Sequence, residues 1–129
     1  MASNVDVVRE FIAAFNDNDL ERVMGLFTPD ALYHNVPVAP VTGSEAIRGV
    51  IQGFLGMAKE VDWIVHRIAE APDGVVLTER TDRFLIGDRW VELPVMGSFA
   101  IREGKVAEWR DYFDLQQFQR QLPGQGQEG

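Results

Sequence analysis

The stretch VVLTERTDRFLI, residues 75–86, decides how the rest of the chain is read. Successive side chains of a β-strand point to opposite faces. One face of this stretch therefore carries Val76, Thr78, Arg80, Asp82, Phe84 and Ile86. Phe84 and Ile86 favour that face as the inner one, over the rival face that starts at Val75. Burying Arg80 and Asp82 costs several kcal/mol unless they satisfy one another, and chains that keep such groups usually do so for chemistry.

Period-two alternation continues through the second half of the chain, over residues 61–69, 89–102 and 105–113. The breaks between these segments are hairpin signals, namely Pro72-Asp73-Gly74, Gly87-Asp88 and Glu103-Gly104-Lys105. The pattern predicts a long antiparallel meander.

Helical spacing dominates the first half. A cap at Ser3 or Asn4 precedes a first helix, and Asp19 caps a short second one. Thr28-Pro29-Asp30 predicts a turn before a short strand at residues 32–36. Ser44 is expected to cap a third helix, whose inward stripe is Ile47, Val50, Ile51, Phe54 and Leu55.

A last short helix is expected over residues 114–121. Helices followed by an antiparallel meander make an α+β domain. A curved sheet wrapped over those helices would leave a pocket inside the curl.

Composition narrows the function classes. The chain has 129 residues and a net charge of −8, which argues against nucleic acid and against an anionic membrane surface, because both need a basic face. It has no cysteine, which excludes disulfides, thiolate metal sites and a cysteine nucleophile and fits a cytoplasmic location. No apolar run approaches the length of a membrane span. We expect one domain over residues 4–121 and a flexible tail over residues 122–129.

Two more polar clusters share faces with apolar side chains. In the last strand, Asp111 shares a face with Lys105, Ala107, Trp109 and Phe113, and we place this face inside. Tyr33 and Asn35 share a face that His34 avoids. The strand at residues 89–102 offers an uncharged inward row that could wall a pocket: Val91, Leu93, Val95, Gly97, Phe99 and Ile101.

Each cluster also has a purely structural interpretation. An inward aspartate near a strand end is often a structural carboxylate whose oxygens are all hydrogen-bonded. Arg-x-Asp on a strand is usually a surface ion pair. Tyr-x-Asn in a short strand is often a structural pair next to a turn. Trp63, Trp90 and Trp109 are expected to be packing residues, and His34 and His66 to be structural or exposed.

The chain resembles the limonene-1,2-epoxide hydrolase family, within the NTF2-like, ketosteroid-isomerase-like superfamily. The matching stretches are Tyr33-His34-Asn35, LTERTD at residues 77–82 and WRDYFDL at residues 109–115, in this order. The resemblance implies a cone formed by a curved, mainly antiparallel mixed sheet wrapped over N-terminal helices, with a deep internal pocket. It also implies a homodimer, and no metal or organic cofactor.

Carried over to this sequence, the resemblance assigns a role to each polar residue. Asp111 matches the base that activates water, and Tyr33 and Asn35 match the groups that hold that water. Asp82 matches the acid that protonates the epoxide oxygen, and Arg80 matches the bridge between the two carboxylates. The expected substrate-binding residues are Phe54, Trp63, Phe84, Leu93, Val95 and Phe118.

These residue types suit one-step addition of water to an epoxide, giving a vicinal diol. Water must lose a proton while the oxirane oxygen gains one, and one carboxylate with one carboxylic acid supplies both. Burial and mutual repulsion can raise the pKa of one aspartate, so that the pair holds a single proton. The apolar wall suggests an alicyclic, aryl or lipid-like epoxide.

Two other functions remain open at this stage. One is another reaction of the same scaffold, such as ketosteroid-type isomerisation, dehydration or polyketide cyclisation. The other is a small-ligand-binding dimer without turnover. A fixed water favours hydrolysis, and a binding module would have no use for both carboxylates.

Overall fold

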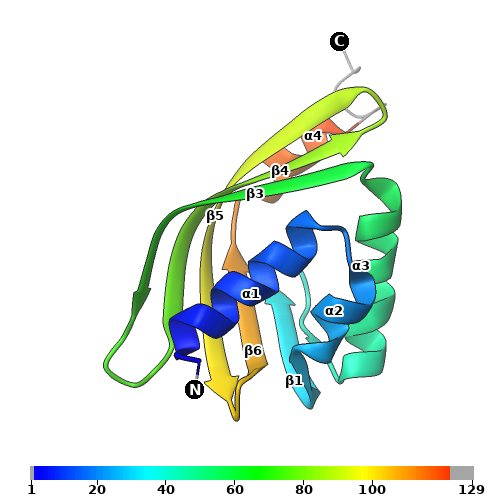
Figure 1. Ribbon diagram of the computed structural model, residues 1–129. Helices are drawn as coiled ribbons and strands as arrows, with labels where there is room; N and C mark the ends of the chain where they lie inside the picture. The colour runs from blue at the N-terminus through cyan, green and yellow to red at the C-terminus, as the bar shows by residue number, and fades with distance from the viewer. Residues whose placement is uncertain (1, 123–129) are drawn as a thin grey trace.

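A six-stranded sheet is the frame of the protein, with strand order β2-β1-β6-β5-β4-β3 (Figure 1). The computed structural model describes residues 2–122. Its elements are α1 (Asn4–Asn16), α2 (Leu20–Gly25), β1 (Phe27–Asn35), β2 (Val41–Thr42), α3 (Ser44–Met57), β3 (Glu60–Glu70), β4 (Val76–Ile86), β5 (Arg89–Arg102), β6 (Lys105–Tyr112) and α4 (Leu115–Gln121). β1 runs parallel to β6, and the other neighbouring pairs are antiparallel. The predicted α+β class with a mainly antiparallel mixed sheet is confirmed.

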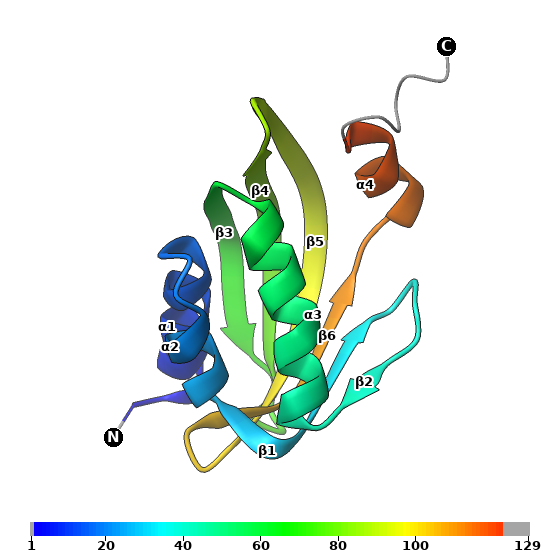
Figure 2. The same ribbon diagram turned by 90° about the vertical axis from the view of Figure 1, so that its right-hand side faces the viewer.

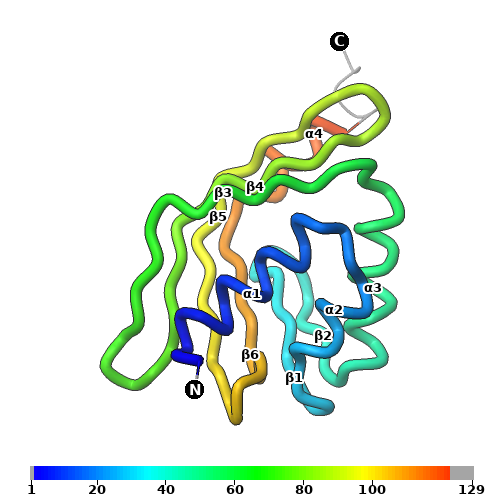
Figure 3. Tube along the Cα trace, viewed as in Figure 1, coloured from blue at the N-terminus to red at the C-terminus, as the bar shows by residue number. Residues whose placement is uncertain are grey.

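The sheet is curved, and the helices cover its concave side. The long strands β3, β4 and β5 bend midway along their length (Figure 3). Register between β3 and β4 shifts between Val65 and Arg67, and a bulge of this kind increases local bending. Turned by 90°, the molecule shows α3 in front of the concave side, with α1 and α2 beside it (Figure 2).

The hydrophobic core lies between the sheet and the helices α1, α2 and α3. Ser3 caps α1 in a capping box with Asp6. Phe11 is fully buried at the centre of the core. Its ring meets four others edge to face, at centroid distances of 5.0 to 6.0 Å: Phe15, Phe27, Phe99 and Trp109.

The end of α1 is hydrogen-bonded to the edge strand β3. The Trp63 backbone N–H donates to Asn16 Oδ1 at 2.7 Å, and Asn16 Nδ2 donates to the Trp63 carbonyl at 3.2 Å. The Asn16 amide therefore pairs with backbone groups that an edge strand would otherwise leave open. This contact fixes the position of Trp63 on the inner face.

β1 is longer than the sequence predicted. The turn expected at Thr28-Pro29-Asp30 is wrong, because residues 27–35 form one strand. Register with β6 shifts between Phe27 and Leu32. This irregularity accommodates Pro29, whose nitrogen has no hydrogen to donate to a ladder. The two-residue strand β2 was also not predicted.

Three smaller predictions are also wrong. Gly43, at a φ of +91°, takes the cap position of α3 that was expected of Ser44. Val50 was placed on the buried stripe of that helix but is 41% exposed. In β6, Lys105 is exposed and Ala107 half-buried. Register shifts there, so that Ala100 pairs with Glu108 but Ile101 pairs with Val106, and Ala107 becomes the extra residue of a bulge that reverses the parity.

Within residues 2–122, none of the helices has the length and apolar character needed to traverse a bilayer. The expected tail falls mostly on residues 123–129, which lie outside the described residues. Leu122, its first residue, packs partly buried against the core.

Candidate functional site

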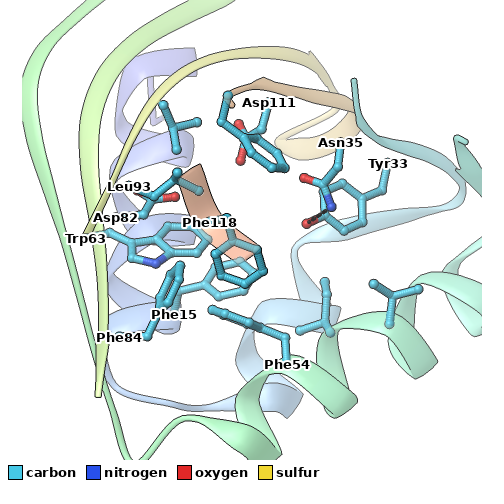
Figure 4. A pocket seen from close by; sticks show the side chains of 14 residues that line it. Phe15, Tyr33, Asn35, Phe54, Trp63, Asp82, Phe84, Leu93, Asp111 and Phe118 are labelled. Atoms are coloured by element: carbon cyan, nitrogen blue, oxygen red, sulfur yellow. Dashed lines mark hydrogen bonds between the residues drawn. The ribbon is translucent and has the colours of Figure 1, made fainter. Parts of the chain in front are cut away.

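A cavity of about 150 Å³ opens between the concave face of the sheet, α3 and α4 (Figure 4). All six predicted substrate-binding residues line it: Phe54, Trp63, Phe84, Leu93, Val95 and Phe118. Four of the five predicted catalytic residues line it as well, namely Tyr33, Asn35, Asp82 and Asp111. Sequence reasoning did not identify four lining residues as pocket residues: Phe15, Val50, Ile51 and Phe113.

Arg80 lies between the two carboxylates. Its Nε and Nη2 donate to Asp82 at 2.9 and 2.8 Å. Nη2 and Nη1 donate to Asp111 at 2.8 and 3.3 Å, and Nη1 also donates to Thr78 Oγ1 at 3.0 Å. A guanidinium has five N–H donors, so Arg80 has a partner for each of them.

The three charged groups are removed from solvent. Arg80, Asp82 and Asp111 are 1%, 3% and 4% exposed. The Arg80 Cζ also lies 5.0 Å from the centroid of the Trp63 ring, a cation–π contact that helps to stabilise a desolvated guanidinium. The parity prediction for β4 is confirmed, since its residues alternate between buried and more exposed positions.

Strand pairing brings the water-positioning candidates to Asp111. In the parallel pair β1–β6, Asn35 is the partner of Asp111 and Tyr33 is the partner of Trp109. Asn35 Nδ2 donates to the Tyr33 hydroxyl at 3.0 Å, which leaves the Tyr33 O–H and the Asn35 carbonyl oxygen available to a third group. Figure 4 shows both side chains beside Asp111 at the cavity.

Trp109 does more than pack, contrary to the prediction from sequence. Its Nε1 donates to Asp111 Oδ1 at 2.8 Å, and its ring stacks on Tyr33 at a centroid distance of 4.3 Å. Thr78, which accepts from Arg80, was not predicted as a site residue either. The signal for both was parity, because each lies two residues before a charged member of the site on the same strand face.

Burial and charge set the protonation of the site. Desolvation raises the pKa of Asp82 to about 6, although the Arg80 charge opposes this shift. Desolvation acts to lower the pKa of Arg80, but the charges of Asp111 and Asp82 outweigh it and raise that pKa above its usual value. Burial, and then the Asp111 charge, raise the pKa of Tyr33, so its phenol stays neutral.

Both histidines, which were expected to be structural or exposed, are absent from the cavity lining. His34 Nε2 lies 3.0 Å from the Val38 carbonyl, and His66 Nε2 lies 2.8 Å from Thr81 Oγ1. Among residues 2–122, no group of three or more His, Cys, Asp or Glu side chains is placed to hold a metal ion.

Because Gly97 has no side chain, there is room beside it for Arg80, Asp111 and Thr78 to meet. A Cβ added there would lie 2.5 Å from Arg80 Nη1 and 2.8 Å from both Asp111 Oδ1 and Thr78 Oγ1. Real Cβ atoms do not approach other atoms so closely, so any side chain at position 97 would displace the guanidinium or the carboxylate.

We predict that Gly97→Ala lowers the free energy of unfolding by about 1–3 kcal/mol, the usual cost of adding a methyl group to a space that is already filled. Urea denaturation measures the loss. Gly53→Ala is the matched control, because nothing lies within 4 Å of a Cβ at that helical position, and alanine there should be neutral or stabilising. A Gly97→Ala protein as stable as the parent would contradict the packing argument.

Comparison with known proteins identifies the family. The family model of the limonene-1,2-epoxide hydrolase catalytic domain matches residues 2–123. Epoxide hydrolase EphG of Mycobacterium tuberculosis is 33% identical over 111 residues, covering 84% of this chain and 71% of the relative.

Solved structures agree. The structure of a Mycobacterium tuberculosis LEH-like epoxide hydrolase has a TM-score of 0.80 at 30% identity, and the match covers 92% of this chain and 88% of the other. A Catenulispora acidiphila protein with a ketosteroid isomerase-like fold has a TM-score of 0.79 at 22% identity, with 90% and 91% of the two chains covered, which supports the fold alone. By the match along almost its whole length, the chain belongs to the limonene-1,2-epoxide hydrolase family.

Proposed function

We propose that the protein is an epoxide hydrolase that adds water to an apolar epoxide by general acid and base catalysis. The observation that carries this proposal is the buried group in which one guanidinium bridges two carboxylates at the wall of an apolar cavity. A relative at 33% identity and a solved structure at 30% identity bear the name epoxide hydrolase. Epoxide and water are accordingly the proposed substrates.

The charge of the bridged group suits this chemistry. With one proton shared between Asp82 and Asp111, the two carboxyls carry one negative charge, and Arg80 balances it. The raised pKa of Asp82 supports its role as the acid, which leaves Asp111 as the base. A neutral group of this composition is tolerable in a dry site, whereas two ionised carboxylates would leave an excess charge.

Asp111 lies where a base is required. A water between Asp111, the Asn35 carbonyl oxygen and the Tyr33 hydroxyl would have an acceptor for each of its protons and a donor for its oxygen. In the reaction, the water oxygen bonds to one oxirane carbon and the C–O bond of that carbon breaks. Asp111 takes a proton from the water, and Asp82 gives its proton to the departing oxygen. The product is the diol, and proton return from Asp111 to Asp82, through Arg80 or solvent, restores the enzyme.

The hydrogen bonds of Asp111 leave one of its oxygens able to act as a base. Its Oδ1 accepts from Trp109 and Arg80, and its Oδ2 accepts from Arg80. A carboxylate oxygen can accept two hydrogen bonds, so Oδ2 keeps a lone pair for a proton of the water. Homodimer formation, implied by the family resemblance, and a cytoplasmic location, with which the absence of cysteine agrees, stay predictions.

We predict that Asp111→Asn and Asp82→Asn each lower kcat/KM by at least about 100-fold, the usual contribution of a general acid or base. Both variants should stay folded, because an amide mimics a protonated carboxyl and the remaining carboxylate still balances Arg80. Diol formation measured by chromatography, with circular dichroism of the same samples, checks both statements.

The double variant is the control for the shared proton. The combination of Asp82→Asn with Asp111→Asn leaves Arg80 without an anion, so the double variant should lose about 3–5 kcal/mol of stability.

For the single variant, retained diol formation in Asp111→Asn would show that Asp111 is not the base.

The source of the added oxygen separates one step from two. In a single turnover with enzyme in excess in ¹⁸O-water, we expect the first diol molecules to carry the label. An ester intermediate would instead deliver an unlabelled carboxylate oxygen and leave ¹⁸O on Asp111, which mass spectrometry of the peptide would detect.

The acid must be protonated to act, so activity depends on pH. Because burial raises the pKa of Asp82 to about 6, the shared proton is held below that pH and lost above it. We predict that log kcat/KM falls by about one unit per pH unit above pH 6. A profile that stays level from pH 5 to 8 would argue against Asp82 as the acid.

A further inference from the structure

The wall of the cavity is unusually rich in aromatic rings. Seven of its fourteen lining residues are Phe, Tyr or Trp. Aliphatic side chains would bury an apolar substrate equally well, so burial of apolar area does not account for this composition. We therefore use the relative orientation of the rings, and not their hydrophobicity, to infer what kind of group binds in the cavity.

Three rings on separate elements form an edge-to-face series at the cavity. Phe54 of α3 meets Phe84 of β4 at a centroid distance of 4.7 Å and an angle of 86°. Phe84 meets Phe118 of α4 at 5.9 Å and 82°. Rings in this relation pair the positive edge of one ring with the negative face of the next. Figure 4 shows the three rings together at one side of the cavity, with Trp63 beside them. A bound aromatic ring would extend the series, and a saturated ring could not.

The volume of the cavity sets the size of the ring. An apolar cavity of about 150 Å³ holds a molecule the size of benzene, and this cavity has the same volume. It has room for one six-membered ring beside the carboxylates, and a second fused ring would extend out through its open side.

We propose, on the basis of the epoxide hydrolase function above, that the substrate is an aryl epoxide with a single aromatic ring. The ring lies against Phe54, Phe84 and Phe118, with the Trp63 ring beside them, and the oxirane reaches Asp82 and Asp111. The reaction consumes water and the aryl oxirane and yields an aryl vicinal diol.

Binding of inert alcohols tests the ring without any turnover. Benzyl alcohol and cyclohexylmethanol differ only in the saturation of the ring, and their Kd values can be obtained by NMR titration of the intact protein. We expect benzyl alcohol to bind about 3- to 10-fold more tightly, the range that aromatic pairing gives beyond area burial. Equal affinity, or preference for the cyclohexyl compound, would overturn the ring proposal.

A variant locates the preference. Phe118→Leu keeps an apolar side chain on a helix that has no buried residue, so the fold should persist while the benzyl preference falls to about twofold or less. Gln119→Leu, at the exposed neighbouring position, should keep the parent ratio. An unchanged ratio in Phe118→Leu would remove that ring from the proposed subsite.

Diol formation separates failure of this proposal from failure of the proposed function. Phenyloxirane and cyclohexyloxirane should both give diols, with the lower KM for phenyloxirane, and 2-naphthyloxirane should react at least tenfold more slowly in kcat/KM. If no epoxide gives a diol, the hydrolase function fails. If diols form without preference for the phenyl compound, or if the naphthyl compound reacts equally well, only the single-ring proposal fails.

Discussion

The Arg80 guanidinium, hydrogen-bonded through all five of its N–H groups, is the constraint on which the site depends. A cation with almost no contact with water needs its anions in fixed positions, because an unpaired buried charge is strongly destabilising. The sheet meets this need by placing Asp82 two residues along the same strand face and Asp111 on β6, across β5. Gly97 lies between those two strands, and its missing side chain lets the charges meet.

Trp109 joins this polar group to the hydrophobic core. One end of its indole donates to Asp111, while its ring contacts Phe11 and Phe99 in the core and Tyr33 at the cavity. Packing of the core therefore also determines the orientation of the carboxylate and of the phenol beside it. A change in the core that rotates Trp109 would alter the site without touching a charged residue.

Parity was sufficient to predict much of this arrangement from the sequence. Regular alternation along β4 placed Arg80 and Asp82 inside, and the same rule found Asp111 and the row from Val91 to Phe99. It failed where a strand is irregular, as at Pro29 and at Ala107, because one extra residue reverses every later side chain. The roles of Trp109 and Thr78 were missed for another reason: parity places both on the inner face, but it does not give the distances on which their hydrogen bonds depend. The family resemblance supplied the assignment of roles, and the volume of the cavity required coordinates.

The division of the cavity wall between sheet and helices has a consequence for evolution and for engineering. The sheet carries Arg80, Asp82, Asp111 and their hydrogen-bonding partners, whereas Val50, Ile51 and Phe54 come from α3 and Phe118 comes from α4. Mutations on the two helices can reshape the cavity and leave the buried group of Arg80, Asp82 and Asp111 in place. A combinatorial library confined to those four positions would vary the shape of the cavity without changing a charged residue. Evolution at the same positions would allow members of the family to differ in ligand preference while keeping the buried charged group.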